Sequence, residues 1–256
     1  MKSFNLRAFF LMFILVVFCF LGFAENKEIT MLFGGGYPPF YLEGPEDGKT
    51  PVEQGMFVDF LEKFEEEYGY TITKIRLPRK RMDLWMSSGQ AQAFSLNNPM
   101  FVEDSDDYLF SDPIWHTKDV VISLKSNQVI YQKPQDLFDV TVAKIAGNGY
   151  GDLDAYFESG QIAAYDVKST DQMIKMLLSG RVDCIIQNIH VFPYIAKNEG
   201  IDVSQFFFND VALFEFELMT QINQEYTQFR DDLNAFIEAY KQNGFLEGIE
   251  KEYLGN

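Results

Sequence analysis

Apolar residues recur every three or four positions in several segments of the chain, which is the spacing of a helix with one buried face. In residues 53–68 the apolar side chains share one face, four glutamates lie opposite, and Gly69 follows as a helix end. A similar spacing predicts helices at residues 79–88, 170–179, about 229–240 and about 245–254. Shorter apolar runs separate these segments, so the chain is expected to alternate between helices and strands.

The predicted strands are short runs rich in β-branched and apolar residues. They lie at residues 28–34, 71–77, 91–96, 140–145 and 182–186. Strands that alternate with helices are typical of parallel sheets. We therefore expect an α/β fold in which mostly parallel sheets are flanked by helices.

The first 24 residues have the pattern of a targeting segment. Two basic residues precede an apolar run of 14 residues, Ala8 to Leu21, which is short for a membrane span. Small residues at positions 22 and 24 mark a cleavage site before Glu25. We expect residues 1–24 to be a cleaved signal peptide and the protein to be periplasmic, with an uncleaved membrane anchor as the alternative.

Composition and charge narrow the possible partners. The 256 residues correspond to about 1.7 domains of average size. Acidic residues outnumber basic ones 38 to 21, and the net charge of −17 repels a phosphate backbone, so we expect no nucleic-acid partner. Of the two cysteines only Cys184 follows the signal peptide, so no internal disulfide is expected. Cys184 is predicted to be a buried strand residue.

Two segments 91 residues apart look like a weak internal repeat. Residues 88–97 and 179–188 each contain a helix end, a Ser-Gly pair, a buried strand and a polar carboxyl end. Ligands of parallel sheets gather beyond the carboxyl ends of the strands. We therefore expect two similar lobes, with Asn97 and Asn188 facing one shared cleft, although a repeat this short can also arise by chance.

Several further motifs occur in a recognisable order. They are Tyr37-Pro38-Pro39-Phe40, the Ser88-Gly89 strand, Phe110-Ser111-Asp112-Pro113-Ile114-Trp115, Gly180-Arg181-Val182-Asp183 and a closing helix that starts at Asn243-Gly244-Phe245. With these motifs the chain resembles the family 3 extracellular solute-binding proteins that serve amino-acid ABC importers. The third motif stands in the place of that family's F-S-D-P-Y-Y.

The resemblance implies a two-lobed periplasmic-binding-protein type II fold with a two-strand hinge. Lobe one would comprise residues 25–118 plus 219–256, and lobe two residues 119–218. The implied function is capture of a small polar, amino-acid-like solute for an ABC transporter permease by a monomeric binding protein. No enzymatic activity, cofactor or metal is expected.

The chain departs from the family at both charged ligand-binding positions. Asp104 stands where amino-acid binders carry an Arg for the ligand carboxylate, and neutral Asn188 stands where they carry an Asp for the ammonium. The chain is similar in this to a branch of the family that lacks the usual Arg. Arg79 and Arg81, at the start of a predicted helix, are candidate replacements, with solvated surface arginines as the alternative.

The remaining candidate ligand-binding residues lie in loops or at strand ends. Aromatic residues at these places either enclose an apolar or cationic part of a ligand or simply pack the loops. A glycine-rich turn at residues 147–151 can present amide groups to an anion, or it can be only a flexible turn. The candidates are Tyr37, Phe40, Trp115 and Tyr150 among the aromatics and Asn98 and Asn148 among the amides.

Two alternative functions stay open at this point. A sensing protein of this fold would need a separate membrane partner. An enzyme on the same scaffold, similar to periplasmic cyclohexadienyl dehydratases, would need an acid–base pair, and the best candidate is Glu53 or Glu103 with His116. His116 and His190 are the only histidines, too few for a metal site at this spacing.

Overall fold

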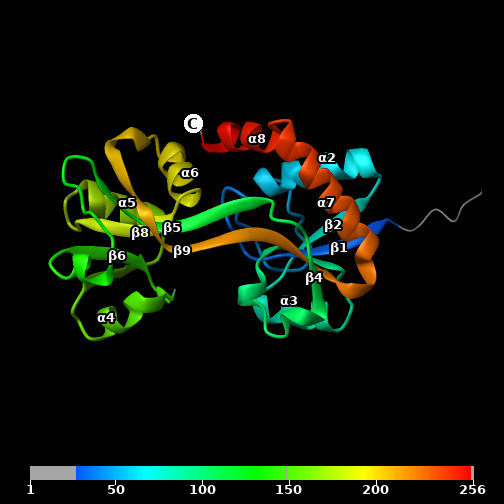
Figure 1. The fold of residues 1–256 in the computed structure, drawn as a ribbon, viewed down its shortest axis with the longest axis horizontal. Helices are drawn as coiled ribbons and strands as arrows, with labels where there is room; N and C mark the ends of the chain where they lie inside the picture. The colour runs from blue at the N-terminus through cyan, green and yellow to red at the C-terminus, as the bar shows by residue number, and fades with distance from the viewer. Residues whose placement is uncertain (1–26, 148, 255–256) are drawn as a thin grey trace, which may run out of the picture.

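The computed structural model describes residues 27–147 and 149–254 of the chain. The predicted signal peptide lies outside these residues. The described chain forms two lobes joined by two long strands (Figure 1). Its strands form one continuous sheet in the order β2-β1-β3-β9-β5-β8-β6-β7, with β4 added alongside β9.

Lobe one is built on three parallel strands, β1 (Glu28–Phe33), β2 (Thr71–Arg76) and β3 (Ala93–Asn97). The short strand β4 (Tyr108–Phe110) and the end of β9 (Phe206–Asn223) extend them in the antiparallel direction. Because the three parallel strands end at the same edge, the segments after them all lie at that edge.

In the described part of lobe one, four helices pack together. They are α2 (Met56–Tyr68), α3 (Arg79–Ser87), α7 (Thr227–Gln242) and α8 (Phe245–Leu254). Phe60 and Phe64 of α2 are fully buried and meet Phe236 of α7, with ring centroids 5.0 and 5.4 Å apart. The hydrophobic core of lobe one is therefore formed by α2, near the beginning of the chain, together with α7, near its end.

Lobe two repeats the parallel arrangement with β6 (Thr141–Ile145), β7 (Ala163–Val167) and β8 (Cys184–Asn188). Its helices are α4 (Asp154–Glu158), α5 (Thr170–Leu178) and α6 (Val191–Asn198). Separate apolar clusters contain Ile185 and Cys184, which are adjacent on β8, so both faces of this sheet are covered. Cys184 is fully buried, as predicted, and burial raises the pKa of its thiol to about 12.

Six short 3₁₀ turns connect these elements in the described residues. They are Pro99–Phe101 (η1), Ser105–Asp107 (η2), Pro134–Leu137 (η3), Gly151–Leu153 (η4), Val203–Gln205 (η5) and Gln224–Tyr226 (η6). No helix in the described part of the chain has the length and apolar character that a membrane crossing requires.

The two lobes are joined by the antiparallel strands β5 (Trp115–Leu124) and β9. Their register shifts between Asp119 and Val120. Such a bulge bends a strand and redirects nearby side chains. The predicted lobe boundaries, after residues 118 and 218, fall inside these two strands and stay a prediction.

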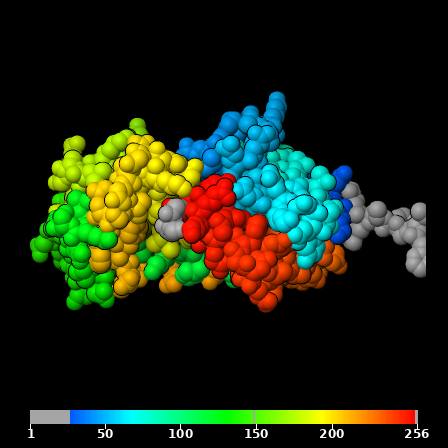
Figure 2. Space-filling model, turned by 90° about the horizontal axis from the view of Figure 1, so that it is seen from above, coloured from blue at the N-terminus to red at the C-terminus, as the bar shows by residue number. Residues whose placement is uncertain are grey.

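A second connection between the lobes is made by the C-terminal helix. Lys197 of α6 donates hydrogen bonds from Nζ to the carbonyl oxygens of Glu252, at 2.9 Å, and Tyr253, at 3.2 Å, in α8. These carbonyls lack partners within their own helix, so the lysine satisfies the helix end. Figure 2 shows α8 in red reaching lobe two on this side.

Most predicted helices and strands occur within three residues of their expected ends. The main difference is the helix expected from residue 53, which begins at Met56 because Gly55 adopts φ 131°, outside the helical region. Several elements were not predicted at all: β4, β7, α4, α6 and the full lengths of β5 and β9. Their apolar residues do not follow one clear period.

We expect Gly55→Ala to destabilise the protein by clearly more than 1 kcal/mol. A Cβ at this position would lie 2.4 Å from the carbonyl oxygen of Phe40, which is backbone and cannot move aside. Gly69→Ala is the matched control, because Gly69 also has positive φ, 71°, but open space around it. Urea unfolding of both variants measures the difference, and equal losses would show that the close approach to Phe40 is unimportant.

Candidate functional site

A buried polar cluster lies where β5 passes β8, at the junction of the lobes. Asp119 and Asn188 are direct neighbours across these antiparallel strands. Asn188 donates from Nδ2 to Asp119 Oδ1 at 2.9 Å and to Thr117 Oγ1 at 2.8 Å. Its Oδ1 accepts the backbone N–H of His190 at 3.0 Å. The amide is therefore held on both sides, and its orientation is fixed.

Lobe one contributes aromatic residues to this cluster from the loop after β1. The Tyr37 hydroxyl meets Thr117, and its ring lies 5.0 Å from Phe40. The Phe40 ring lies 5.3 Å from that of His190, which belongs to lobe two. His190 Nδ1 lies 3.0 Å from Thr117 Oγ1. Side chains from both lobes and from a connecting strand thus converge here.

Burial controls the charge of the groups in this cluster. It raises the pKa of the Asp119 carboxyl, while the hydrogen bond from Asn188 opposes the shift. Burial raises the pKa of Tyr37, and that of Tyr150 to about 12, and the Asp119 carboxylate adds to both increases. Burial lowers the pKa of His190 to about 4, so this imidazole is neutral at pH 7.

The structure holds the two predicted asparagines at the end of β3 against β9. Asn97 is buried and donates from Nδ2 to Gln221 Oε1 at 2.8 Å. Asn98 donates from Nδ2 to the carbonyl oxygen of Glu217 at 2.8 Å, and its Oδ1 accepts the N–H of Met100. Both amides therefore serve the connection between β3 and β9, and their contact with a ligand stays a prediction.

Three of the four predicted aromatic residues, Phe40, Trp115 and Tyr150, are buried, and their contact with a ligand stays a prediction. Phe40 and Trp115 belong to the core of lobe one. The Tyr150 hydroxyl accepts the backbone N–H of Ile145 at 2.8 Å and so closes its own loop in lobe two. Of the aromatic candidates, Tyr37 alone keeps intermediate exposure. Asn148 lies outside the described residues.

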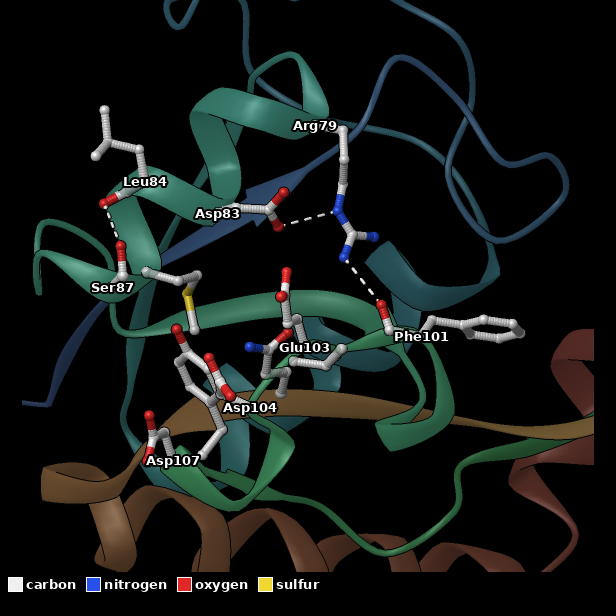
Figure 3. Close-up of a pocket in the computed structure, with 12 residues that line it drawn as sticks. Arg79, Asp83, Leu84, Ser87, Phe101, Glu103, Asp104 and Asp107 are labelled. Carbon is white, nitrogen blue, oxygen red and sulfur yellow. Dashed lines mark hydrogen bonds and ion pairs between the residues drawn. The ribbon is translucent and has the colours of Figure 1, made fainter. Parts of the chain in front are cut away.

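The two candidate arginines lie on α3 in lobe one. Arg79 donates from Nε to Asp83 Oδ1 at 3.0 Å and from Nη2 to the carbonyl oxygen of Phe101 at 3.5 Å (Figure 3). Its guanidinium also lies 5.0 Å from the centre of the Phe94 ring. The Arg81 side chain is exposed and makes no hydrogen bond or ion pair within the described residues, whereas its backbone N–H donates to the carbonyl oxygen of Pro78 at 2.8 Å. Arg79 is thus already engaged, whereas Arg81 is solvated.

The same helix borders an acidic pocket of about 480 Å³ (Figure 3). Glu103, Asp104 and Asp107 line it opposite the Arg79–Asp83 pair. Asp104 adopts a left-handed conformation with φ 55°, and its correspondence to the family's Arg stays a prediction. The pocket lies wholly among residues of lobe one and the adjoining part of β9, so it is separate from the polar cluster between the lobes.

The predicted acid–base pair of His116 with Glu53 or Glu103 is not formed. His116 lies instead between two glutamates of β9, with Nε2 2.7 Å from Glu215 and Nδ1 3.1 Å from Glu217. The reason is register, because His116 pairs directly with Glu217 across the two connecting strands. Within residues 27–147 and 149–254, no group of three or more acidic, His or Cys side chains is arranged to hold a metal ion.

Sequence reasoning missed Thr117 and Asp119 as members of the polar cluster. One signal was available, because Asp119 is a charged residue immediately before the apolar run Val120-Val121-Ile122. A carboxylate at the edge of a buried strand needs a special environment. Which residues surround it depended on the pairing of β5 with β8.

The two-lobed sheet with a two-strand connection defines the type II periplasmic-binding-protein architecture. The family model for bacterial extracellular solute-binding proteins, family 3, matches residues 29–256. The chain belongs to this family. No protein of curated function matches the sequence.

Solved structures show the same fold at low identity. A polar amino acid ABC uptake transporter substrate-binding protein from Streptococcus thermophilus is 16% identical with TM-score 0.71, covering 91% of this chain and 88% of its own. The L-cystine solute receptor of Neisseria gonorrhoeae, unliganded and open, is 15% identical with TM-score 0.68, covering 91% and 94%. An amino acid ABC transporter substrate-binding protein from Streptococcus pneumoniae, bound to L-arginine, is 17% identical with TM-score 0.61, covering 90% and 95%.

Proposed function

We propose that this protein captures a small polar, amino-acid-like solute between its lobes and delivers it to the permease of an ABC importer. The observation that carries the proposal is the convergence of Tyr37 from lobe one, Asp119 from a connecting strand and Asn188 from lobe two. Membership of the solute-binding family and the amino-acid binders among the structural relatives support the same role.

In the proposed mechanism the solute docks on lobe one beside the loop that carries Tyr37. Lobe two then rotates about β5 and β9 and completes the site with Asn188. A solute favours closure only through contacts that exist in the closed state alone. A shift from 1% to 99% closed requires about 5.5 kcal/mol of such contacts, which a few hydrogen bonds to charged groups can supply.

The cellular setting is part of the proposal. An apolar N-terminal segment of signal-peptide type would direct export, and the mature protein would act outside the cytoplasmic membrane. Family 3 proteins are extracellular solute-binding proteins, which supports this location. The proposed partners are one small-molecule solute and one membrane permease, with the binding protein acting as a monomer.

A thermal-shift screen over amino acids, amines, short peptides and carboxylates tests this function. A true solute at about 100 times its Kd should add about 2.7 kcal/mol to the free energy of unfolding. The same solute should reduce the radius of gyration in X-ray scattering, because the lobes close on it. A panel without any stabilising solute, or scattering unchanged at saturation, would contradict the proposal.

A further inference from the structure

Asp119 is a half-buried carboxylate for which the described protein supplies no cation. Its polar contact is the amide of Asn188, at 2.9 Å, and no lysine or arginine of the described residues is among the groups that shift its pKa. His190, on the same cluster, is neutral at pH 7. A partly buried charge is costly unless it is paired, so this site is electrostatically incomplete.

The position of Asp119 makes it the common neighbour of three predicted ligand-binding residues. It contacts Asn188 directly and acts electrostatically on Tyr37 and Tyr150, which belong to opposite lobes. It also stands at the register shift between β5 and β9. A group bound to Asp119 would therefore lie between the lobes and next to the hinge.

We infer that Asp119 is the acceptor for a cationic group of the solute, an alkylammonium or a guanidinium. The inference rests on the proposed function and names the chemical class of its solute. Asn188 orients the carboxylate by donating to Oδ1, which leaves Oδ2 for the solute. Tyr37 borders the same space with an aromatic ring, a surface that favours cations.

In this strand pair the carboxylate stands on β5 and the amide on β8, and one hydrogen bond joins them. Among the described residues, no lysine or arginine side chain is hydrogen-bonded to Asp119 or is among the groups that shift its pKa. The charge of the junction therefore selects solutes that carry positive charge there.

Calorimetry with agmatine, putrescine, L-arginine, L-lysine and L-glutamate provides the test. We expect wild-type protein to bind at least one of the four cationic probes and to bind glutamate more weakly. Agmatine lacks the carboxylate of arginine, so the ratio of their Kd values shows whether the protein also recognises an anionic group of the solute. Asp119→Asn should weaken binding of the cationic probe at least about 30-fold. Asp139→Asn removes the same charge from an exposed position and should change Kd less than twofold.

A carboxylate–amide exchange separates the role of charge from damage to the fold. Asp119→Asn combined with Asn188→Asp reverses the donor and acceptor but keeps one carboxylate in the cluster. We expect the double variant to recover affinity to within about tenfold of wild type, with unchanged circular dichroism. Undiminished binding by Asp119→Asn, or no recovery in a folded double variant, would overturn the inference.

The same measurements distinguish the two proposals. If the wild-type protein binds only neutral or anionic solutes, the role of Asp119 is wrong while the solute-binding function stands. If none of the four cationic probes binds, the inference is likewise overturned. If no solute of the wider thermal-shift screen binds either, the proposed function fails with it.

Discussion

Replacing Phe236 by alanine is expected to lower the free energy of unfolding by about 3–5 kcal/mol. Its side chain is fully buried, and its ring lies 5.0 Å from Phe60, 5.4 Å from Phe64 and 4.2 Å from Tyr240. Truncation removes apolar contacts on every side and leaves a cavity that the surrounding aromatic rings fill poorly. Urea unfolding followed by tryptophan fluorescence and circular dichroism measures the loss.

The result also tests how lobe one is assembled. Phe236 belongs to α7, which returns to lobe one after the chain has passed through lobe two. Phe101→Ala is the matched control, because that side chain is 48% exposed and should cost less than about 1 kcal/mol. Similar losses for the two variants would contradict the packing of α7 on α2.

Lowering the pH from 6.5 to 4 is expected to remove about 3 kcal/mol of stability through His190 alone. The native pKa of this buried imidazole is about 4, below its ordinary value of 6.5. Between pH 6.5 and 4, the His190 imidazole therefore binds a proton more readily in the unfolded chain than in the native protein. The contribution is fully present above pH 6.5 and is lost as the pH falls toward the native pKa.

His190→Gln separates this effect from the titration of carboxylates. The variant is expected to be less stable at pH 7, because it loses the contact with Thr117, but its stability should fall about 3 kcal/mol less between pH 6.5 and 4. His116 acts in the opposite direction, because Glu217 and Glu215 raise its pKa. If the stability of the wild-type protein and that of the variant fall in parallel with pH, His190 has an ordinary pKa and the prediction is wrong.

The helices and strands that were predicted most accurately are those in which the spacing of apolar or β-branched residues is clearest. Residues 53–68 have apolar positions that recur with a helical period, and α2 occupies all but the first three of them. The strand at residues 71–77 was equally clear, since four of its first five residues are β-branched. Such patterns arise because one face of each element is buried, and this holds in any fold that uses the element.

The connecting strands illustrate where local patterns fail. β9 extends over 18 residues, through both lobes, and most of its residues have intermediate exposure rather than alternating burial. The register shift at Asp119 belongs to the pairing of β9 with β5. Neither the length nor the register can be derived from β9 alone, because the partner strand lies about 90 residues earlier in the chain.

The candidate site shows the same division. Tyr37 and Asn188 were identified from their motifs, and both belong to the polar cluster. Arg81 is a candidate because of its place at the start of a helix; α3 presents it to solvent, and its contact with a ligand stays a prediction. His116 was matched with glutamates that lie elsewhere, whereas its register places it beside Glu215 and Glu217.

The sequence by itself determined the alternation of helices and strands, the two-lobed family fold and the acidic character of the protein. These properties depend on local periodicity, on short motifs and on composition, all of which are carried by neighbouring residues. Only the tertiary structure decided that Asp119 meets Asn188 and lies near Tyr37. Those contacts join residues separated by about 70 to 80 positions, and pairing over such distances is set by strand register and lobe packing.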